Sequence, residues 1–197
     1  MSSITPAVPI PLSWEKNHPE RAAWTAHTLS TLKPHLPDLD IAADITQFAP
    51  RYGTLHDDQK LAVWGELISA VAYFESSWNP CSRYKEPMAD KDSVTGEPIY
   101  SEGLLQLSYQ DVKTYSQLHL PFDWNADKLL ARDDCSKTIL DPLRNLTGGI
   151  AILVEQVRKH KAIILKRPYW STLRDPAAGT TKVPEIIDMV RKLPYAV

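Results

Sequence analysis

Apolar residues in the segment 57–75 recur at spacings of three and four. Such spacing places side chains on one face of an α-helix. Asp57, a good N-cap residue, stands just before the run. The pattern therefore predicts a long helix that begins near Asp57 and buries one face. The apolar members of that face are Leu61, Trp64, Ile68 and Val71.

Helical signals also occur before this segment. Pro19 suits the first turn of a helix over 19–33, and Pro34 and Pro37 are expected to end it. A second short helix is predicted from Leu39 to Phe48, before a further proline. Residues 1–13 are punctuated by proline and predict an arm over the surface, which leaves 14–197 as a single domain.

Two later segments predict helices as well. The Asp-Pro pair at 141–142 opens a helix that runs to 160, and a last helix is expected from Pro184 to Leu193. The apolar face of the first of these comprises Leu143, Leu146, Ile150, Leu153 and Val157.

Residues 79–102 carry no helical period and are rich in Pro, Asp, Ser and Gly. They predict a long loop with a short hairpin around "SVTGEPIYS", and loops of this length are usually functional or disordered. "SYQD" then resembles a capping motif, with Ser108 as N-cap of a helix to about Leu118. The predicted fold class is mainly α, with a long loop and a short β-hairpin.

Composition narrows the function classes. Net charge is −2 at pH 7, which is not the footprint of a nucleic-acid-binding protein. No run of about 20 apolar residues predicts a membrane span, and the first residues do not predict a signal peptide. Six histidines are scattered without a Cys or Asp at ligand spacing, so we expect no metal. They are His18, His27, His35, His56, His119 and His160.

Glu75 follows Val71 by four residues, so we expect it on the buried side near a helix end. Burial disfavours the charged carboxylate and raises its pKa above the usual value of about 4.3. A carboxylic acid that keeps its proton can protonate a leaving group. The alternative is a structural Glu that pairs with an arginine or caps a neighbouring helix, and position alone favours this alternative.

A wider pattern favours the chemical interpretation. "ESSWNP" at 75–80, followed after the loop by "SEGLLQLS" at 101–108, resembles the paired signature of the lytic transglycosylase and goose-type lysozyme superfamily. Leu105 stands where that family usually has Met. "DPLRNLTGGIAIL" at 141–153 resembles a third part of the pattern, in which Asn145 and the two following glycines would pack against the catalytic helix. The resemblance covers about 58–175.

The resemblance implies a lysozyme-like α-helical domain that cleaves the β-1,4 bond between N-acetylmuramic acid and N-acetylglucosamine in peptidoglycan. Glu75 would protonate the glycosidic oxygen and then act as base on water or on the muramyl 6-hydroxyl. "RPYWSTLR" offers Tyr169 as a cleft tyrosine, with Trp170 as its rival. The substrate-binding residues implied are Ser76, Gly103, Gln106, Tyr109, Asn145 and Tyr169.

A hydrolase usually has a second carboxylate across the sugar. We assign that role to Glu102, because it precedes Gly103 where relatives carry a small residue, and this slightly favours hydrolysis. The alternative for each loop acid is a solvated surface charge. The loop acids are Glu86, Asp90, Asp92, Glu97 and Glu102. They outnumber the lysines there, so the loop also favours a cationic sugar such as deacetylated glucosamine.

Cysteine usage alone is compatible with two unrelated buried thiols and with one disulfide. Because wall-lytic enzymes work outside the cytoplasm, the resemblance implies a Cys81–Cys135 disulfide and a secreted or periplasmic mature form. The expected partners are peptidoglycan glycan strands, with no cofactor and a monomeric state. Two other functions stay open: a chitosan- or chitin-degrading glycosidase of the same superfold, and a non-catalytic glycan-binding wall protein.

Overall fold

The computed structural model describes residues 10–87 and 91–197, so the expected arm at 1–13 lies mostly outside the described residues. The chain is mainly helical with one two-stranded sheet, which confirms the predicted fold class. The α-helices are α1 (Ser13–Asn17), α2 (Ala22–Leu32), α3 (Leu36–Leu39), α4 (Ile45–Phe48), α5 (Asp57–Ser76), α6 (Asp111–Thr114), α7 (Trp124–Asp127), α8 (Pro142–His160) and α9 (Val183–Val190). The 3₁₀ turns are η1 (Pro19–Arg21), η2 (Lys33–His35), η3 (Tyr52–Thr54), η4 (Ser116–Leu118), η5 (Ser171–Leu173) and η6 (Pro176–Ala178).

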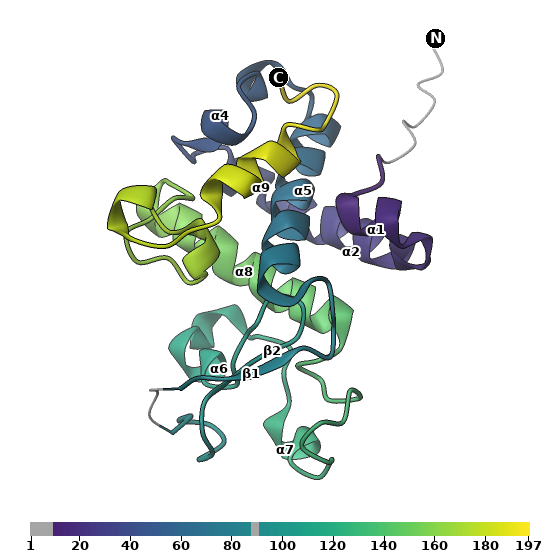
Figure 1. Cartoon of the computed structure of the whole chain (residues 1–197), viewed down its shortest axis with the longest axis vertical. Helices are drawn as coiled ribbons and strands as arrows, with labels where there is room; N and C mark the ends of the chain where they lie inside the picture. The colour runs from purple at the N-terminus through teal and green to yellow at the C-terminus, as the bar shows by residue number, and fades with distance from the viewer. Residues whose placement is uncertain (1–9, 88–90) are drawn as a thin grey trace.

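Helix α5 runs through the centre of the molecule, with α2 and α9 packed against it (Figure 1). The predicted long helix is thus confirmed, although its N-cap is His56, whose side chain and that of Gln59 form a capping box. Residues 61–72 of α5 are buried throughout, because neighbouring helices cover every side of it. The helix can therefore hold a residue at its end in a defined position.

Helix α8 matches its predicted bounds. The Asp141 side chain accepts a hydrogen bond from the backbone N–H of Arg144 and caps the helix. The resemblance implied that the glycines of α8 pack against α5, but their nearest neighbours belong to other segments. A Cβ at Gly148 would meet the ring of Phe122, and one at Gly149 would overlap the Leu105 side chain. These glycines instead let the chain that carries Leu105 approach α8 closely.

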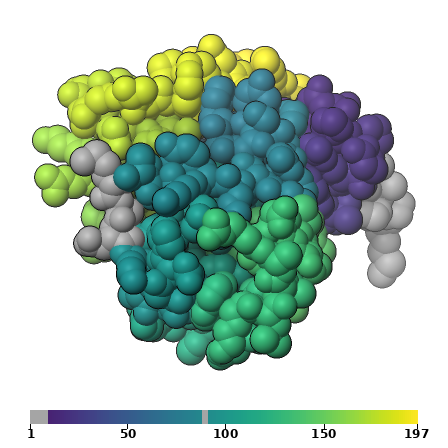
Figure 2. Space-filling model, turned by 60° about the horizontal axis from the view of Figure 1, so that its bottom comes forward, coloured from purple at the N-terminus to yellow at the C-terminus, as the bar shows by residue number. Residues whose placement is uncertain are grey.

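The predicted hairpin is confirmed, with strands further apart along the chain than expected. β1 (Arg83–Lys85) pairs with β2 (Tyr100–Glu102) in antiparallel register, with Tyr84 opposite Ser101. The sheet, α6 and α7 form the lower part of the molecule in Figure 1. Figure 2 shows this part as the teal and green surface below α5. The predicted loop therefore folds back on itself beneath the end of α5.

Two predicted helices are wrong in extent. The segment 39–48 holds only the last residue of α3 and the single turn of α4, because the Asp44 carboxylate accepts bonds from the backbone N–H groups of Ile163 and Ile164 and fixes a turn there. The segment after Ser108 forms only α6 and η4. The Ser108 hydroxyl donates to Asp92 instead of capping a helix. Tertiary hydrogen bonds replace the local ones in both places.

Pro34 and Pro37 follow the end of α2 at Leu32, as predicted, but they do not prevent further helical turns. They occupy the first turns of η2 and α3, respectively, so that three short helical segments follow one another. A proline in a first turn costs no hydrogen bond, since the N–H there has no helical partner. α9 begins within a residue of its predicted start and ends at Val190, three residues before Leu193. Among the described residues, no helix is both long enough and apolar enough to span a membrane.

Candidate active site

Glu75 lies in the last turn of α5 and is partly buried. Its carboxylate accepts a hydrogen bond of 2.8 Å from the Thr172 hydroxyl, which η5 supplies from 97 residues away along the chain. Among the described residues, no arginine or lysine pairs with it. The first form of the structural alternative, a Glu that pairs with an arginine, therefore does not apply.

The environment favours the protonated form of this carboxyl. Burial raises the pKa of Glu75 above its ordinary value, the negative charge of Glu86 raises it further, and the Thr172 hydrogen bond opposes both. Glu75 also lies at the C-terminus of α5, where the carbonyl groups carry partial negative charge and no basic side chain of the last turn balances it. The expected raised pKa of Glu75 is thus present, with desolvation as its largest cause.

The chain leaves α5 through two successive left-handed residues. Ser77 has φ 53° and Trp78 has φ 60°, a conformation that is costly for a bulky side chain. The indole N–H of Trp78 donates to the Ser69 carbonyl at 2.8 Å, and the ring stacks against Tyr73. These contacts hold the strained turn in place. The turn redirects the chain just after Glu75 and leads it toward β1.

Glu75 opens onto a groove of about 500 Å³ between the end of α5, the hairpin and the segment before η5. We call this the glutamate groove. Its lining residues are Glu75, Ser82, Arg83, Tyr84, Glu86, Ser101, Gln106, Tyr169, Trp170 and Ser171. Of the predicted site residues, the structure therefore brings Glu75, Gln106 and Tyr169 together.

Glu86, one of the loop acids, is a second carboxylate in the groove. It follows β1, and its backbone N–H donates to the Ile99 carbonyl at 3.0 Å, which continues the hairpin. Its carboxylate accepts a hydrogen bond of 2.5 Å from the Ser101 hydroxyl. The hairpin register decides that Glu86 faces the groove, and no local pattern in the sequence reveals that register.

Glu102, our predicted second acid, does not line the glutamate groove. It is 2% exposed and pairs with Arg83 at 2.7 Å. It lines a separate hollow of about 240 Å³ together with Tyr109, whose hydroxyl donates to Asp127 at 2.7 Å. The assignment of Glu102 as second acid and of Tyr109 as a sugar ligand of the same groove is therefore wrong. Both serve a buried polar cluster behind the hairpin.

The remaining loop acids also lie elsewhere. Asp92 is 3% exposed, and its carboxylate accepts bonds from Val94, Thr95, Ser108 and Gln110. Its role is to fold the loop. Glu97 lines the hollow behind the hairpin, and Asp90 lies outside the described residues.

The turn after β2 presents Gln106 to the groove. Gly103 has φ 79°, and a Cβ there would overlap the side-chain nitrogen of Asn145. Only glycine fits this position without strain. Gln106 itself has φ 49°, and its side-chain amide donates to the Gly103 carbonyl at 2.8 Å. The turn thus holds Gln106 in one orientation.

Asn145 and Ser76 hold this turn from behind. Asn145 is fully buried, accepts a bond from the Leu105 N–H at 2.8 Å, and donates to the carbonyls of Glu102 and Ile139. The Ser76 hydroxyl lies 2.9 Å from the Leu104 carbonyl. Direct sugar binding by these two side chains, as predicted, is therefore wrong, because their polar atoms are engaged by the backbone.

Tyr169 and Trp170 both border the groove. The Tyr169 hydroxyl donates to the buried carboxylate of Asp111, and the indole N–H of Trp170 donates to the Leu105 carbonyl at 2.7 Å. Burial raises the pKa of Asp111 to about 6, a shift that the Tyr169 hydrogen bond opposes. Tyr169 thus forms a fixed wall, and Trp170 anchors the neighbouring turn.

Cys81 and Cys135 form a disulfide, with Cα atoms 5.4 Å apart, so the predicted pairing is confirmed. It ties the chain just beyond α5 to the loop after α7. Within residues 10–87 and 91–197, no group of three or more His, Cys, Asp or Glu is arranged to hold a metal ion.

Comparison with known proteins reveals close structural neighbours. The chain is similar to the wild-type form 2 structure of Bd0314 DslA, a Bdellovibrio protein, with 28% identity and a TM-score of 0.76 over 97% of this chain and all of that one. It is also similar to two Glu→Gln mutants of the same protein, at 27% and 26% identity with TM-scores of 0.77 and 0.74 and the same coverage. No protein-family model and no curated protein sequence matches the chain.

Proposed function

We propose that this protein is a glycosidase that cleaves peptidoglycan glycan strands, with Glu75 as acid and base. The observation that carries the proposal is a carboxyl that lines an open groove and whose pKa is raised by burial and by a second carboxylate. A group of this kind is suited to protonate a glycosidic oxygen.

The reaction would use two roles of Glu75. Its proton passes to the bridging oxygen as the bond from that oxygen to the anomeric carbon breaks. The carboxylate then accepts a proton from the nucleophile that attacks the anomeric carbon. Water as nucleophile gives a reducing end, and the 6-hydroxyl of the same sugar gives a 1,6-anhydro end.

Glu86 takes the role that we had assigned to Glu102. A second carboxylate in the groove can stabilise the positive charge that develops at the anomeric carbon, or activate water. The neighbour structures add support, since the two glutamates changed to glutamine in them are 11 positions apart. Glu75 and Glu86 are separated by the same interval. Glu86 therefore favours hydrolysis.

The carboxylate of Glu86 in the groove also supports a preference for a cationic, deacetylated amino sugar. Arg83 lines the groove too, but Glu102 neutralises it. The disulfide supports an oxidising compartment, and hence secretion or a periplasmic location.

The test is turbidity clearing of purified sacculi by wild type and by Glu75→Gln. We expect loss of at least about 10³-fold in rate for the variant, since glutamine cannot donate the acid proton. Glu75→Gln with undiminished activity would overturn the assignment. Masses of the released fragments then distinguish reducing from anhydro ends, and Glu86→Gln should slow formation of reducing ends.

A second set of substrates tests the sugar preference. Sacculi with and without deacetylation should differ in rate, and the preference should fall in Glu86→Gln. Equal rates on both, or faster cleavage of acetylated wall, would remove this part of the proposal. Chitosan is the second candidate substrate, because the paired carboxylates suit it as well. Cleavage of chitosan oligomers without clearing of sacculi would identify that activity.

A further inference from the structure

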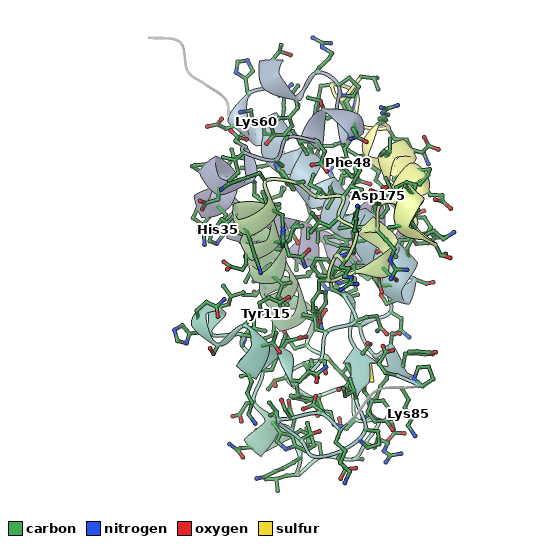
Figure 3. The ribbon with its side chains drawn as sticks, turned by 90° about the vertical axis from the view of Figure 1, so that its left-hand side faces the viewer. His35, Phe48, Lys60, Lys85, Tyr115 and Asp175 are labelled. Carbon is green, nitrogen blue, oxygen red and sulfur yellow. A yellow bond between two sulfur atoms is a disulfide. The ribbon has the colours of Figure 1, made fainter. Side chains whose placement is uncertain are left out.

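A further hollow, of about 400 Å³, shares Tyr169 as a lining residue with the glutamate groove. It is formed by the segment 114–117, the last turns of α8 and the segment 165–169. Figure 3 looks onto this side of the molecule and labels Tyr115 beside the ribbon of α8. Because Tyr169 lines both spaces, the hollow is the immediate neighbour of the glutamate groove.

The hollow has a positive charge. The segment 158–167, "RKHKAIILKR", holds five Lys or Arg residues and no acid, in a chain whose net charge is −2. Lys159 and Arg167 line the hollow, and Glu155 is its one acidic lining residue. We call it the cationic hollow.

The two cations are available to a ligand. Within the described part of the chain, neither Lys159 nor Arg167 forms an ion pair, whereas Arg158 on the same helix turn is paired with Asp38 at 2.6 Å. Compensation of the helix dipole accounts for basic residues in the last turn of α8. It does not account for Arg167, which lies beyond the end of α8.

The two spaces therefore differ in charge across one tyrosine. The glutamate groove carries Glu75 and Glu86, and its Arg83 is paired with Glu102. The cationic hollow carries Lys159 and Arg167 against the single acid Glu155. A peptidoglycan strand has the same division, because its sugars are uncharged or cationic and its peptides carry carboxylates. Guanidinium and ammonium groups bind carboxylates through charge-assisted hydrogen bonds.

We propose that the cationic hollow is an anion-binding subsite that takes a carboxylate of the peptide attached to the strand bound in the glutamate groove. This rests on the proposed function, since it assumes that the groove holds peptidoglycan. Arg167 and Lys159 are the residues that would bind the carboxylate, and the wall formed by Tyr169 and Tyr115 would contact the peptide.

The test compares two soluble glycan fragments of equal length, one with its peptides and one from which an amidase has removed them. Wild type should show a KM about tenfold lower for the peptide-bearing fragment. Lys159→Gln/Arg167→Gln should lose that difference with kcat unchanged on the peptide-free fragment. Lys166→Gln, which removes an exposed charge of the same run that does not line the hollow, should behave as wild type.

A binding measurement keeps this test separate from the proposed function. Calorimetry with the Glu75→Gln protein, with and without the two hollow substitutions, measures binding of the peptide-bearing fragment without cleavage. An affinity that is about tenfold weaker with the substitutions supports the subsite even if wild type cleaves neither fragment. Equal affinity for the peptide-bearing fragment with and without the two substitutions would overturn the proposal. So would an equal loss of affinity for the peptide-bearing and the peptide-free fragment.

Discussion

The carboxyl of Glu75 has two neighbours that shift its pKa in opposite directions. Thr172 donates a hydrogen bond to the charged form and lowers the pKa, whereas the charge of Glu86 raises it. Both act on a group that burial has already shifted upward. At the scale of single residues, the site is thus a carboxylic acid whose proton is controlled from η5 on one side and from the hairpin on the other.

These neighbours predict opposite changes in the pH profile. If Glu75 must be protonated, the alkaline limb of kcat/KM follows its pKa in the free enzyme. Thr172→Val should move that limb to higher pH, because the hydrogen bond that favours the anion is lost. Glu86→Gln should move it to lower pH, because a repelling charge is lost. Shifts of both variants in the same direction would contradict this account.

Asp111 predicts a pH dependence of stability. Its pKa is about 6 in the folded protein against an ordinary value of 3.8, so the folded state binds its proton more tightly than the unfolded state. The stabilisation is fully present below about pH 4 and is lost as pH rises through about 6, by roughly 3 kcal/mol. Asp111→Asn should flatten this part of the curve of unfolding free energy against pH. An unchanged slope would show that Asp111 titrates normally.

At the scale of elements, the turn between β2 and α6 depends on one asparagine. The side chain of Asn145 in α8 forms hydrogen bonds with two backbone groups of this turn and with the carbonyl of Ile139. It also occupies the space that a side chain at position 103 would need. This turn places Gln106 at the groove. Helix α8 therefore shapes the site without touching the groove itself.

This dependence predicts a contrast between two glycines. Gly103→Ala should lower the free energy of unfolding by about 2 kcal/mol or more, because of its positive φ and the overlap with Asn145. It should also reduce activity. Gly53→Ala is the matched control, since a Cβ there meets nothing within 4 Å, and it should change stability by about 0.5 kcal/mol or less. Chemical denaturation of both variants tests this, and equal stability would contradict it.

At the scale of the whole molecule, the glutamate groove lies where the α5 end meets the hairpin region, and the disulfide joins the chain on both sides of that region. Cys81 and Cys135 are separated by 54 positions. A closed loop of that length restricts the unfolded chain, which stabilises the fold by about 4 kcal/mol in the entropy model.

The disulfide predicts a sensitivity to reductant. Cys81→Ala/Cys135→Ala should lower the unfolding free energy by about 2–4 kcal/mol. Reductant should destabilise wild type by a similar amount and leave the double variant unchanged. A destabilisation of the double variant by reductant would point to another cause. Thermal unfolding with and without reductant measures both.

The sequence alone determined the features that local patterns control. The apolar stripe over 57–76 and the capped Asp-Pro start at 142 predict α5 and α8, because helix periodicity and capping depend on residues a few positions apart. The raised pKa of Glu75 could be predicted in the same way, from its place on the stripe.

Only the tertiary structure decided which polar groups share a space. Glu86 and not Glu102 lines the groove because the hairpin register places Glu86 on the face of Tyr84 and Ser101 and Glu102 on the opposite face with Arg83. Asn145 is a support and not a ligand because α8 packs directly behind the turn. Such pairings join residues tens of positions apart, so no local pattern records them, whereas the folded chain determines them through packing.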